Sequence, residues 1–500
     1  MTDLVAEYLN AHGVGADRQA LLRRDVGHWI NGSLSQTGEP IAVIEPSTAG
    51  VLCQTFEAGP ALVDQAVAAA RAAFEDDAWS GLRPLDRQQM ILALADLVEA
   101  NKDELALMES VDVGKPVDQA LEVDLGGAVD VLRYFAGWAG KISGRTAPPC
   151  AYDASFFGLT LKKPVGVVAA ITPWNFPLQT LIWKCAAAFA TGCTVVAKPS
   201  EISPLSALRF AELTQAAGFP PGVFNLINGT GAQTGAALVA HKDVRKITFT
   251  GSTQAGKVIG ASALATMKRL TLELGGKSPV LVTESADLDQ AVEGVINGIF
   301  FNAGQVCDAG SRVIVSDEIY DDFVDRLVQK ARTLKIGPGL EEGTFLGPLA
   351  SQAHHKKVTS MVQKAQADGL AVLLNLSQQP GPGFFHGPVI IGDCPSEHPC
   401  WTDEIFGPVL ACQRATSEAD LLRAAHETDY GLGAAIFSQD HAQVLRLMRR
   451  LNAGTIYVNG HGFLDPAFPF GGQGMSGFGK DLGEEQLEAY LETVSVLFSQ

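Results

Sequence analysis

The chain has 500 residues, 47% of them hydrophobic, and carries 37 Lys and Arg against 55 Asp and Glu, for a formal net charge of −18. This length exceeds what one hydrophobic core usually serves, so we expect two or more domains. The acidic balance argues against nucleic acid or an anionic membrane as a partner, because both require a basic patch.

The N-terminal segment carries an acid and no early Lys or Arg, unlike a secretory signal or an Arg-rich transit peptide, which predicts a cytoplasmic protein. The longest apolar run, residues 181–197, is interrupted by Lys184 and by Thr191-Gly192. We therefore interpret it as a buried helix followed by a buried strand, and we expect no membrane span.

The eight cysteines show neither a disulfide framework nor zinc-ligand spacing, so reduced thiols are expected. Cys185 and Cys193 fall in the apolar run and should be core residues, whereas Cys394 and Cys400 are expected in a surface loop. The adjacent pair at 354–355 cannot share one helix face, and no ligand cluster accompanies it, so we predict no metal site.

Short β-branched runs alternate with longer helical patterns along the chain. Strands are predicted at 41–45 and 51–57, followed by helices, one of them alanine-rich at 62–74. Further strands are predicted at 165–171, 194–198, 223–227 and 246–250. A second set starts at 274–282 and 312–315. This rhythm predicts the α/β class, with two parallel α/β lobes and a cleft between them.

Residues 152–163 and 494–498 alternate apolar and polar side chains. Such half-exposed strands need a partner at their edge.

Three turn segments carry the candidate chemistry: 172–177, 271–277 and 300–312. The last ends an apolar helical pattern in a Gly-Gln turn that presents Cys307, a nucleophile candidate. Asn175 lies between two prolines, and its neutral amide can donate to a developing oxyanion. Glu273 lies in a Gly-rich, apolar turn, where desolvation would raise its pKa toward that of a general base.

Taken together and in this order, the three segments resemble the aldehyde dehydrogenase superfamily, and the resemblance runs from about residue 30 to 492. It implies a Rossmann-like cofactor domain at 1–141 and 164–272, a catalytic domain at 273–485, and a small β oligomerisation arm at 142–163 and 486–500. It also implies a homodimer or homotetramer.

The implied reaction converts an aldehyde to the free carboxylic acid with NAD. Cys307 forms a thiohemiacetal and then a thioester, Asn175 and the Cys307 backbone N–H stabilise the oxyanion, and Glu273 activates the hydrolytic water. The alternatives are a CoA-acylating semialdehyde dehydrogenase, a cysteine esterase on the same fold, and a binding or structural protein that has retained the fold. Glu273 argues against the first, because a retained base suits attack by water.

Residues 251–256 follow a strand and open a helix, an arrangement that suits a pyrophosphate. By resemblance, Lys198 and Glu201 bind the adenosine ribose, Gly231 lies near the adenosine, Glu404 binds the nicotinamide ribose, and Phe406 packs near the nicotinamide. The other implied cofactor residues are Ile171, Thr172, Trp174, Gly251 and Ser252. A carboxylate at Glu201 would repel a 2′-phosphate, which favours NAD over NADP.

The implied substrate pocket contains no Lys or Arg, so a distal carboxylate on the aldehyde lacks a clamp. Its expected residues are Phe176, Gln179, Thr180, Trp183, Val306, Leu464 and Phe470. Asp308 departs from the family, which usually has a small or uncharged residue there. If it faces the pocket it disfavours the thiolate and anionic substrates, and if it faces away it does neither. Both orientations stay open.

Overall fold

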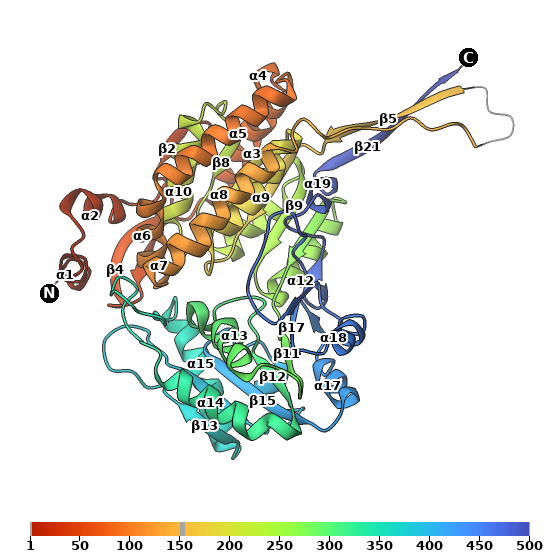
Figure 1. Ribbon diagram of the computed structural model, residues 1–500. Helices are drawn as coiled ribbons and strands as arrows, with labels where there is room; N and C mark the ends of the chain where they lie inside the picture. Colours follow the sequence, from red (N-terminus) through yellow and green to blue (C-terminus); the bar gives the residue numbers. More distant parts are fainter. Residues whose placement is uncertain (1–2, 151–155, 500) are drawn as a thin grey trace.

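The computed structural model describes residues 3–150 and 156–499, which form two lobes and a projecting arm (Figure 1). Two short helices, α1 (Leu4–Ala11) and α2 (Ala16–Leu22), start the chain. A hairpin, β3 (Pro40–Glu45) with β4 (Gly50–Phe56), follows close to the strands expected there. The α/β class expected from the alternating pattern is confirmed.

The first lobe is built on an eight-stranded sheet in the order β2-β1-β8-β7-β6-β9-β10-β20. Its five central strands are parallel: β8 (Phe224–Leu226), β7 (Thr194–Lys198), β6 (Val167–Ile171), β9 (Val244–Thr250) and β10 (Arg269–Glu273). Every residue of β6 and β7 is buried, as in a sheet covered by helices on both faces.

The edges of this sheet are formed by short strands that were not predicted from the sequence. The edge hairpin β1 (His28–Ile30) and β2 (Ser33–Ser35) turns at Asn31 and Gly32, which both have positive φ and suit a tight hairpin. At the other edge, β20 (Gly477–Phe478) pairs antiparallel with β10. The C-terminal part of the chain thus returns to the first lobe beside Glu273.

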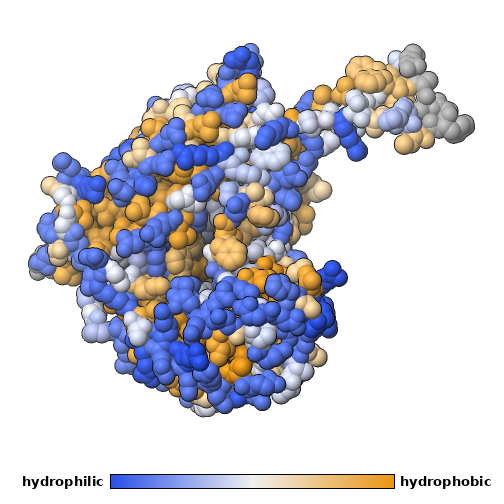
Figure 2. Space-filling view, in the orientation of Figure 1, coloured by the Kyte–Doolittle hydropathy of each residue, from blue (hydrophilic) through white to orange (hydrophobic). Residues whose placement is uncertain are grey.

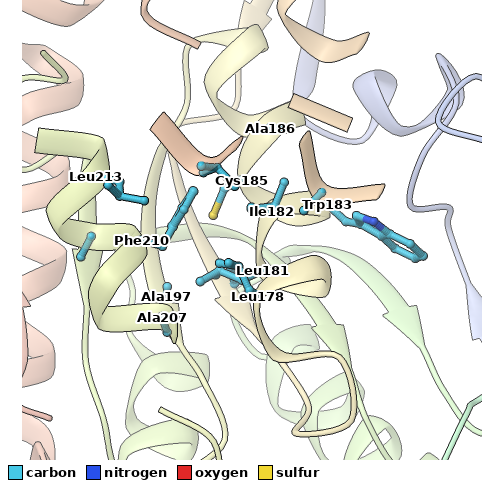
Figure 3. Packing of buried hydrophobic residues seen from close by; sticks show 14 of the residues in the cluster. Leu178, Leu181, Ile182, Trp183, Cys185, Ala186, Ala197, Ala207, Phe210 and Leu213 are labelled. Carbon is cyan, nitrogen blue, oxygen red and sulfur yellow. The ribbon is translucent and has the colours of Figure 1, made fainter. Parts of the chain in front are cut away.

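Helix α9 (Pro177–Thr191) connects the candidate site to the core. Proline at its first position and Gly192 in the left-handed conformation after its last turn delimit it. Its neighbours are α10 (Leu205–Ala216) and α8 (Gly126–Ala136). In Figure 3, Leu178 and Leu181 of α9 lie near Phe210 of α10, whereas Trp183 points away from this contact. The apolar run at 181–197 is therefore a buried helix and strand, as expected.

Further helices complete the first lobe: α3 (Gly59–Glu75), α4 (Asp77–Ser80), α5 (Pro84–Ala100), α6 (Lys102–Val113), α7 (Val117–Gln119), α11 (Ala236–Ala240), α12 (Thr253–Leu264) and α19 (Glu485–Glu488). Between α7 and α8 the chain forms a π-helix, η1 (Ala120–Leu125), and a second one, η2 (Gly231–Gly235), follows β8. Such wide turns are rare and concentrate at functional sites.

The second lobe holds a seven-stranded sheet in the order β13-β14-β15-β12-β11-β17-β18. Its strands are β13 (Ala371–Asn375), β14 (Val389–Gly392), β15 (Val409–Ala415), β12 (Arg312–Ser316), β11 (Pro279–Val282), β17 (Gly433–Phe437) and β18 (Thr455–Val458), with only β13 antiparallel to its neighbour. The helices packed around it are α13 (Leu288–Phe300), α14 (Tyr320–Arg332), α15 (Gln352–Ala367), α16 (Pro399–Thr402), α17 (Glu418–Ala425) and α18 (His441–Met448).

The arm pairs β5 (Phe156–Pro164) antiparallel with β21 (Leu491–Ser499), from Leu491 opposite Pro164 to Ser499 opposite Phe156. Figure 1 shows the two strands projecting away from both lobes. Residues 151–155 and 500 of the expected arm lie outside the described residues.

One expectation about the cysteines is wrong. Cys394 and Cys400 are each only 1% exposed and belong to the core of the second lobe. Cys185 and Cys193 are fully buried, as expected. No described helix is long and apolar enough to cross a membrane, and residues 3–150 and 156–499 hold no cluster of three or more metal-ligating side chains.

Candidate active site

A cavity of about 550 Å³ lies between the lobes and brings together side chains from both. Figure 2 shows apolar side chains gathered around a hollow in this region. All the catalytic and substrate-pocket candidates from the sequence line it: Asn175, Phe176, Gln179, Thr180, Trp183, Glu273, Val306, Cys307, Asp308, Leu464 and Phe470.

The cavity also contains residues that sequence reasoning missed. Glu122 and Asp130 come from η1 and α8, and His461 and Phe463 come from the loop after β18. Asp481 lines it as well. No local pattern marks these residues, since they reach the cavity only when distant segments pack together.

The loop before Cys307 has an unusual backbone. Asn302, Ala303 and Gly304 have φ values of 48°, 53° and 74°, so two non-glycine residues lie in the left-handed region, which costs on the order of 1–2 kcal/mol each. A Cβ at Gly304 would lie 2.3 Å from the carbonyl of Gly407, so only glycine fits there. Local strain of this kind concentrates at functional sites.

Hydrogen bonds hold this loop in place. The Asn302 backbone N–H donates to Gln119 Oε1 (3.1 Å), and the Ala350 N–H donates to Gln305 Oε1 (2.9 Å). The Asn302 side-chain amide donates to the Asn175 carbonyl (3.1 Å), which ties the nucleophile loop to the segment before α9.

Asn175 is positioned to donate into the cavity. One N–H of its amide donates to the Gln305 carbonyl at 2.9 Å, and the amide group carries a second N–H. Within the described residues, the backbone N–H of Cys307 makes no hydrogen bond. Two donors are therefore available beside the thiol.

The Cys307 thiol faces the cavity and is partly exposed. Burial raises its pKa well above the usual value, and the carboxylates of Asp308, Glu273 and Glu404 raise it further, whereas the Asp308 backbone N–H lowers it. The thiol form is thus the resting state, and the proton must leave before attack.

Glu273 ends β10, is 3% exposed, and has no hydrogen-bond partner on either carboxylate oxygen. Burial raises its pKa well above that of an ordinary carboxylic acid. Asp481 raises the pKa further, and Lys184 and Lys480 lower it. A Cβ at Gly471 would lie 2.4 Å from Glu273 Oε1, so this glycine leaves room for the carboxylate. A raised pKa makes the ionised form of this unpaired carboxylate a stronger base, which is the property that a general base needs.

A buried ion pair lies next to Glu273. Lys184 Nζ is 2.7 Å from Asp481 Oδ2, and the two side chains are 0% and 1% exposed. Lys184 also donates to Thr248 Oγ1 (3.3 Å), and Gln486 Nε2 donates to Asp481 Oδ1 (3.1 Å).

Asp308 faces the cavity, which answers the orientation question that the sequence left open. It is 5% exposed, and its Oδ2 accepts a hydrogen bond from the Tyr457 hydroxyl at 2.7 Å. No other hydrogen bond reaches this carboxylate within the described residues.

The expected cofactor residues lie outside this cavity. Ile171 pairs with Lys198 where β6 and β7 end, and the Thr172 N–H donates to the Lys198 carbonyl. Lys198 Nζ lies 3.6 Å from Glu201 Oε2. Burial lowers the pKa of Lys198, and Glu201 and Glu57 oppose this effect. The carboxyl ends of parallel strands are where such sheets bind ligands.

The dinucleotide loop is only partly as expected. Ser252 caps α12 by accepting the Ala255 N–H, but the Gly251 N–H donates to the Glu273 carbonyl and is not free for a phosphate. No heavy atom lies within 4 Å of the ideal Cβ position at Gly231, so the space beside it is open.

At the opposite end of the expected cofactor site, Glu404 accepts the Gly276 N–H (3.0 Å), and Gly275 leaves space for the same carboxylate. The rings of Trp174, His354 and Phe406 form a cluster in which Trp174 meets Phe406 edge-on at 5.4 Å. A capped helix N-terminus, carboxylates for ribose hydroxyls and this aromatic cluster fit a dinucleotide.

The chain is similar to known proteins over nearly its whole length. The model of the aldehyde dehydrogenase family matches residues 33–496. DhaS of Bacillus subtilis (strain 168), whose name places it in the same family, is 42% identical over 94% of both chains. The phenylacetaldehyde dehydrogenase of Pseudomonas fluorescens is 40% identical over 95% of both chains.

Among solved structures, the NAD⁺ complex of an aldehyde dehydrogenase from Bacillus cereus superimposes with a TM-score of 0.95 at 39% identity, covering 97% of this chain and 99% of that one. Several 10-formyltetrahydrofolate dehydrogenases also match, and the chain spans about half of their length. The family, fold and enzyme class expected from the motifs are thereby confirmed: the chain belongs to the aldehyde dehydrogenase family.

Proposed function

We propose that the protein oxidises an aldehyde to the free carboxylic acid with NAD, through covalent intermediates on Cys307. The observation that carries this proposal is a single cavity lined by a thiol, an amide donor and an unpaired carboxylate, namely Cys307, Asn175 and Glu273. These are the nucleophile, oxyanion donor and base that the reaction requires.

In the first step Cys307 loses its proton to solvent, its sulfur bonds to the aldehyde carbon, and the carbonyl π electrons move onto the oxygen, giving the oxyanion of a thiohemiacetal. The second N–H of Asn175 and the backbone N–H of Cys307 donate to the oxygen, which carries the developing negative charge. One such donor typically contributes about 3 kcal/mol to lowering the barrier. When bound, NAD supplies the acceptor for the hydride that leaves the adduct carbon.

The thioester that remains on Cys307 is hydrolysed with Glu273 as the base. In its ionised form Glu273 takes a proton from water while the water oxygen bonds to the acyl carbon. The carbon–sulfur bond then breaks to release the acid, and the proton held by Glu273 passes to the leaving thiolate and restores the thiol. The two unpaired oxygens of Glu273 are available for this water. A retained base of this kind favours hydrolysis over acyl transfer to CoA.

Glu404, Trp174 and Phe406 would hold the nicotinamide end of the cofactor, and Lys198 and Glu201 would bind the adenosine ribose. The Glu201 carboxylate would repel a 2′-phosphate, so we propose that NAD is preferred over NADP. This assignment is supported by the carboxylate and aromatic groups described above and by the NAD⁺ complex of the similar Bacillus cereus enzyme.

We also propose that 1–141 and 164–272 act as the cofactor domain, 273–485 as the catalytic domain, and the arm as a contact between subunits of a dimer or tetramer. The exposed apolar side chains of the arm support the last point, because Phe157, Leu497 and Phe498 are each at least half exposed.

The test is NADH formation from an aldehyde, with the acid identified by mass spectrometry and CoA omitted. Cys307→Ala should retain less than about 1% of turnover because it cannot form the adduct. Cys150→Ala removes an exposed thiol outside the cavity and should behave as the parent. Substantial turnover by Cys307→Ala, or an absolute need for CoA, would refute the proposal.

A further inference from the structure

The ionisable side chains of the cavity are mostly acidic. Five carboxylate side chains line it, from Glu122, Asp130, Glu273, Asp308 and Asp481, and the lining includes no Lys or Arg of the described chain. His461 also lines the cavity, but burial lowers its pKa, with Asp308 opposing this effect, so at neutral pH the imidazole adds no positive charge.

Two of the five carboxylates already have a partner or a role. Asp481 is paired with Lys184 at 2.7 Å, and Glu273 is the proposed base. Three remain. Glu122 and Asp130 are exposed at the cavity mouth, and neither forms an ion pair with another described residue.

The third, Asp308, lies deep in the cavity next to the nucleophile. Only 5% of it is exposed, and the Tyr457 hydroxyl fixes one oxygen while the other accepts no hydrogen bond within the described residues. The second oxygen is not among the buried, unpartnered side-chain atoms of the described residues, so it is accessible from the cavity and can accept from or pair with a ligand.

Aromatic rings complete the lining and suit a cation as well. Phe301, Phe463 and Trp183 all line the cavity, and Phe463 is 62% exposed near its mouth while its ring meets Tyr457 edge-on at 5.1 Å. Ring faces attract ammonium groups, which carboxylates also attract.

We propose that the cavity selects aldehydes that carry a positively charged nitrogen, an amino or quaternary ammonium group, with Asp308 binding the cation beside Cys307 and with Glu122 and Asp130 attracting it at the mouth. This inference rests on the proposed function and narrows its substrate class. An aldehyde with a carboxylate at the same position meets repulsion along the whole route.

The first experiment compares a cationic aldehyde with its neutral isostere and with an anionic aldehyde. We would measure kcat/KM with NAD for (trimethylammonio)acetaldehyde, the neutral isostere tert-butylacetaldehyde, and the anionic succinic semialdehyde. The cation should exceed its isostere by about tenfold, a difference of about 1.4 kcal/mol. In Asp308→Asn the ratio of kcat/KM for the cation to that for its isostere should fall close to one. Asp118→Asn, which deletes an exposed charge outside the cavity, should preserve it.

Attraction of the cation by Glu122 and Asp130 at the cavity mouth should be visible in how kcat/KM depends on ionic strength. In a Glu122→Gln/Asp130→Asn double variant, kcat/KM for the cation should lose its dependence on ionic strength, whereas kcat should change little. A ratio of cation to isostere near one in the parent, or a preference for the anion, would overturn the inference while NADH formation still upheld the proposed function.

A second measurement needs no turnover. In a Cys150→Ala background, the rate at which Cys307 forms a mixed disulfide, with release of methanesulfinate, would be measured by peptide mass for methanethiosulfonates that carry trimethylammonium, methyl or sulfonate groups. The cationic reagent should react at least about tenfold faster than the sulfonate, and Asp308→Asn should narrow that gap. Equal rates for the three reagents would refute a cation-selective cavity even if no tested aldehyde were oxidised.

Discussion

Breaking the buried Lys184–Asp481 pair should destabilise the protein and shift the titration of Glu273 in a direction set by which partner is removed. The two side chains are 0% and 1% exposed and 2.7 Å apart. After Lys184→Met, Asp481 keeps only its contact with Gln486. Removing one partner of a buried pair lowers the free energy of unfolding by about 3–5 kcal/mol, a large part of the roughly 5–15 kcal/mol by which a typical protein is stable.

The stability part is measured by urea unfolding of Lys184→Met, Asp481→Asn and the double variant Lys184→Met/Asp481→Leu. The free energy of unfolding of each single variant should fall by about 3–5 kcal/mol. The double variant should recover most of this stability, because apolar side chains often replace a buried pair without destabilising the protein. A double variant that is as unstable as the sum of the two singles would show that the pair contributes packing rather than charge compensation.

The catalytic part follows from the sign of each charge. Lys184 lowers the pKa of Glu273 and Asp481 raises it. Lys184→Met should therefore move the acidic limb of the steady-state pH profile to higher pH, and Asp481→Asn should move it to lower pH. Shifts in the same direction in both variants would refute an electrostatic action of this pair on Glu273.

Three further predictions test the site. Glu273→Gln should retain the burst of NADH but lose steady-state turnover by about 100-fold or more, since hydride loss precedes hydrolysis. Rapid-mixing absorbance measures both quantities. If the burst falls as much as the steady-state rate, Glu273 acts on the thiol instead. Glu201→Ser should narrow the preference for NAD over NADP, measured as the ratio of kcat/KM values, by about 1–2 kcal/mol, because it removes one uncompensated contact between the carboxylate and the 2′-phosphate. A parent enzyme that already prefers NADP would contradict this reasoning. Gly304→Ala should impair acylation and lower the unfolding midpoint, because the added Cβ meets the Gly407 carbonyl at 2.3 Å; Gly343→Ala, a positive-φ glycine with no atom near its ideal Cβ, controls for backbone strain alone.

Most of the fold and the candidate catalytic residues have local signals in the sequence. Apolar runs bounded by glycine and proline predict β6, α9 and β7 within a few residues. Cys307 and Asn175 lie in short turns and Glu273 ends β10, each within a recognisable sequence motif, and all three line one cavity. Short edge strands such as β1 and β20 were missed, since two or three residues hold too little periodicity to detect.

Tertiary structure alone decided which charges meet. Lys184 and Asp481 are 297 residues apart in sequence, and the orientation of Asp308 depends on a hydroxyl 149 residues away. The burial of Cys394 and Cys400, against expectation, likewise comes from packing within the second lobe. Sequence patterns indicate the structure that each segment prefers by itself. Burial, charge pairing and the sign of the electrostatic field in a cavity depend on several segments at once, and only the folded chain brings these segments together.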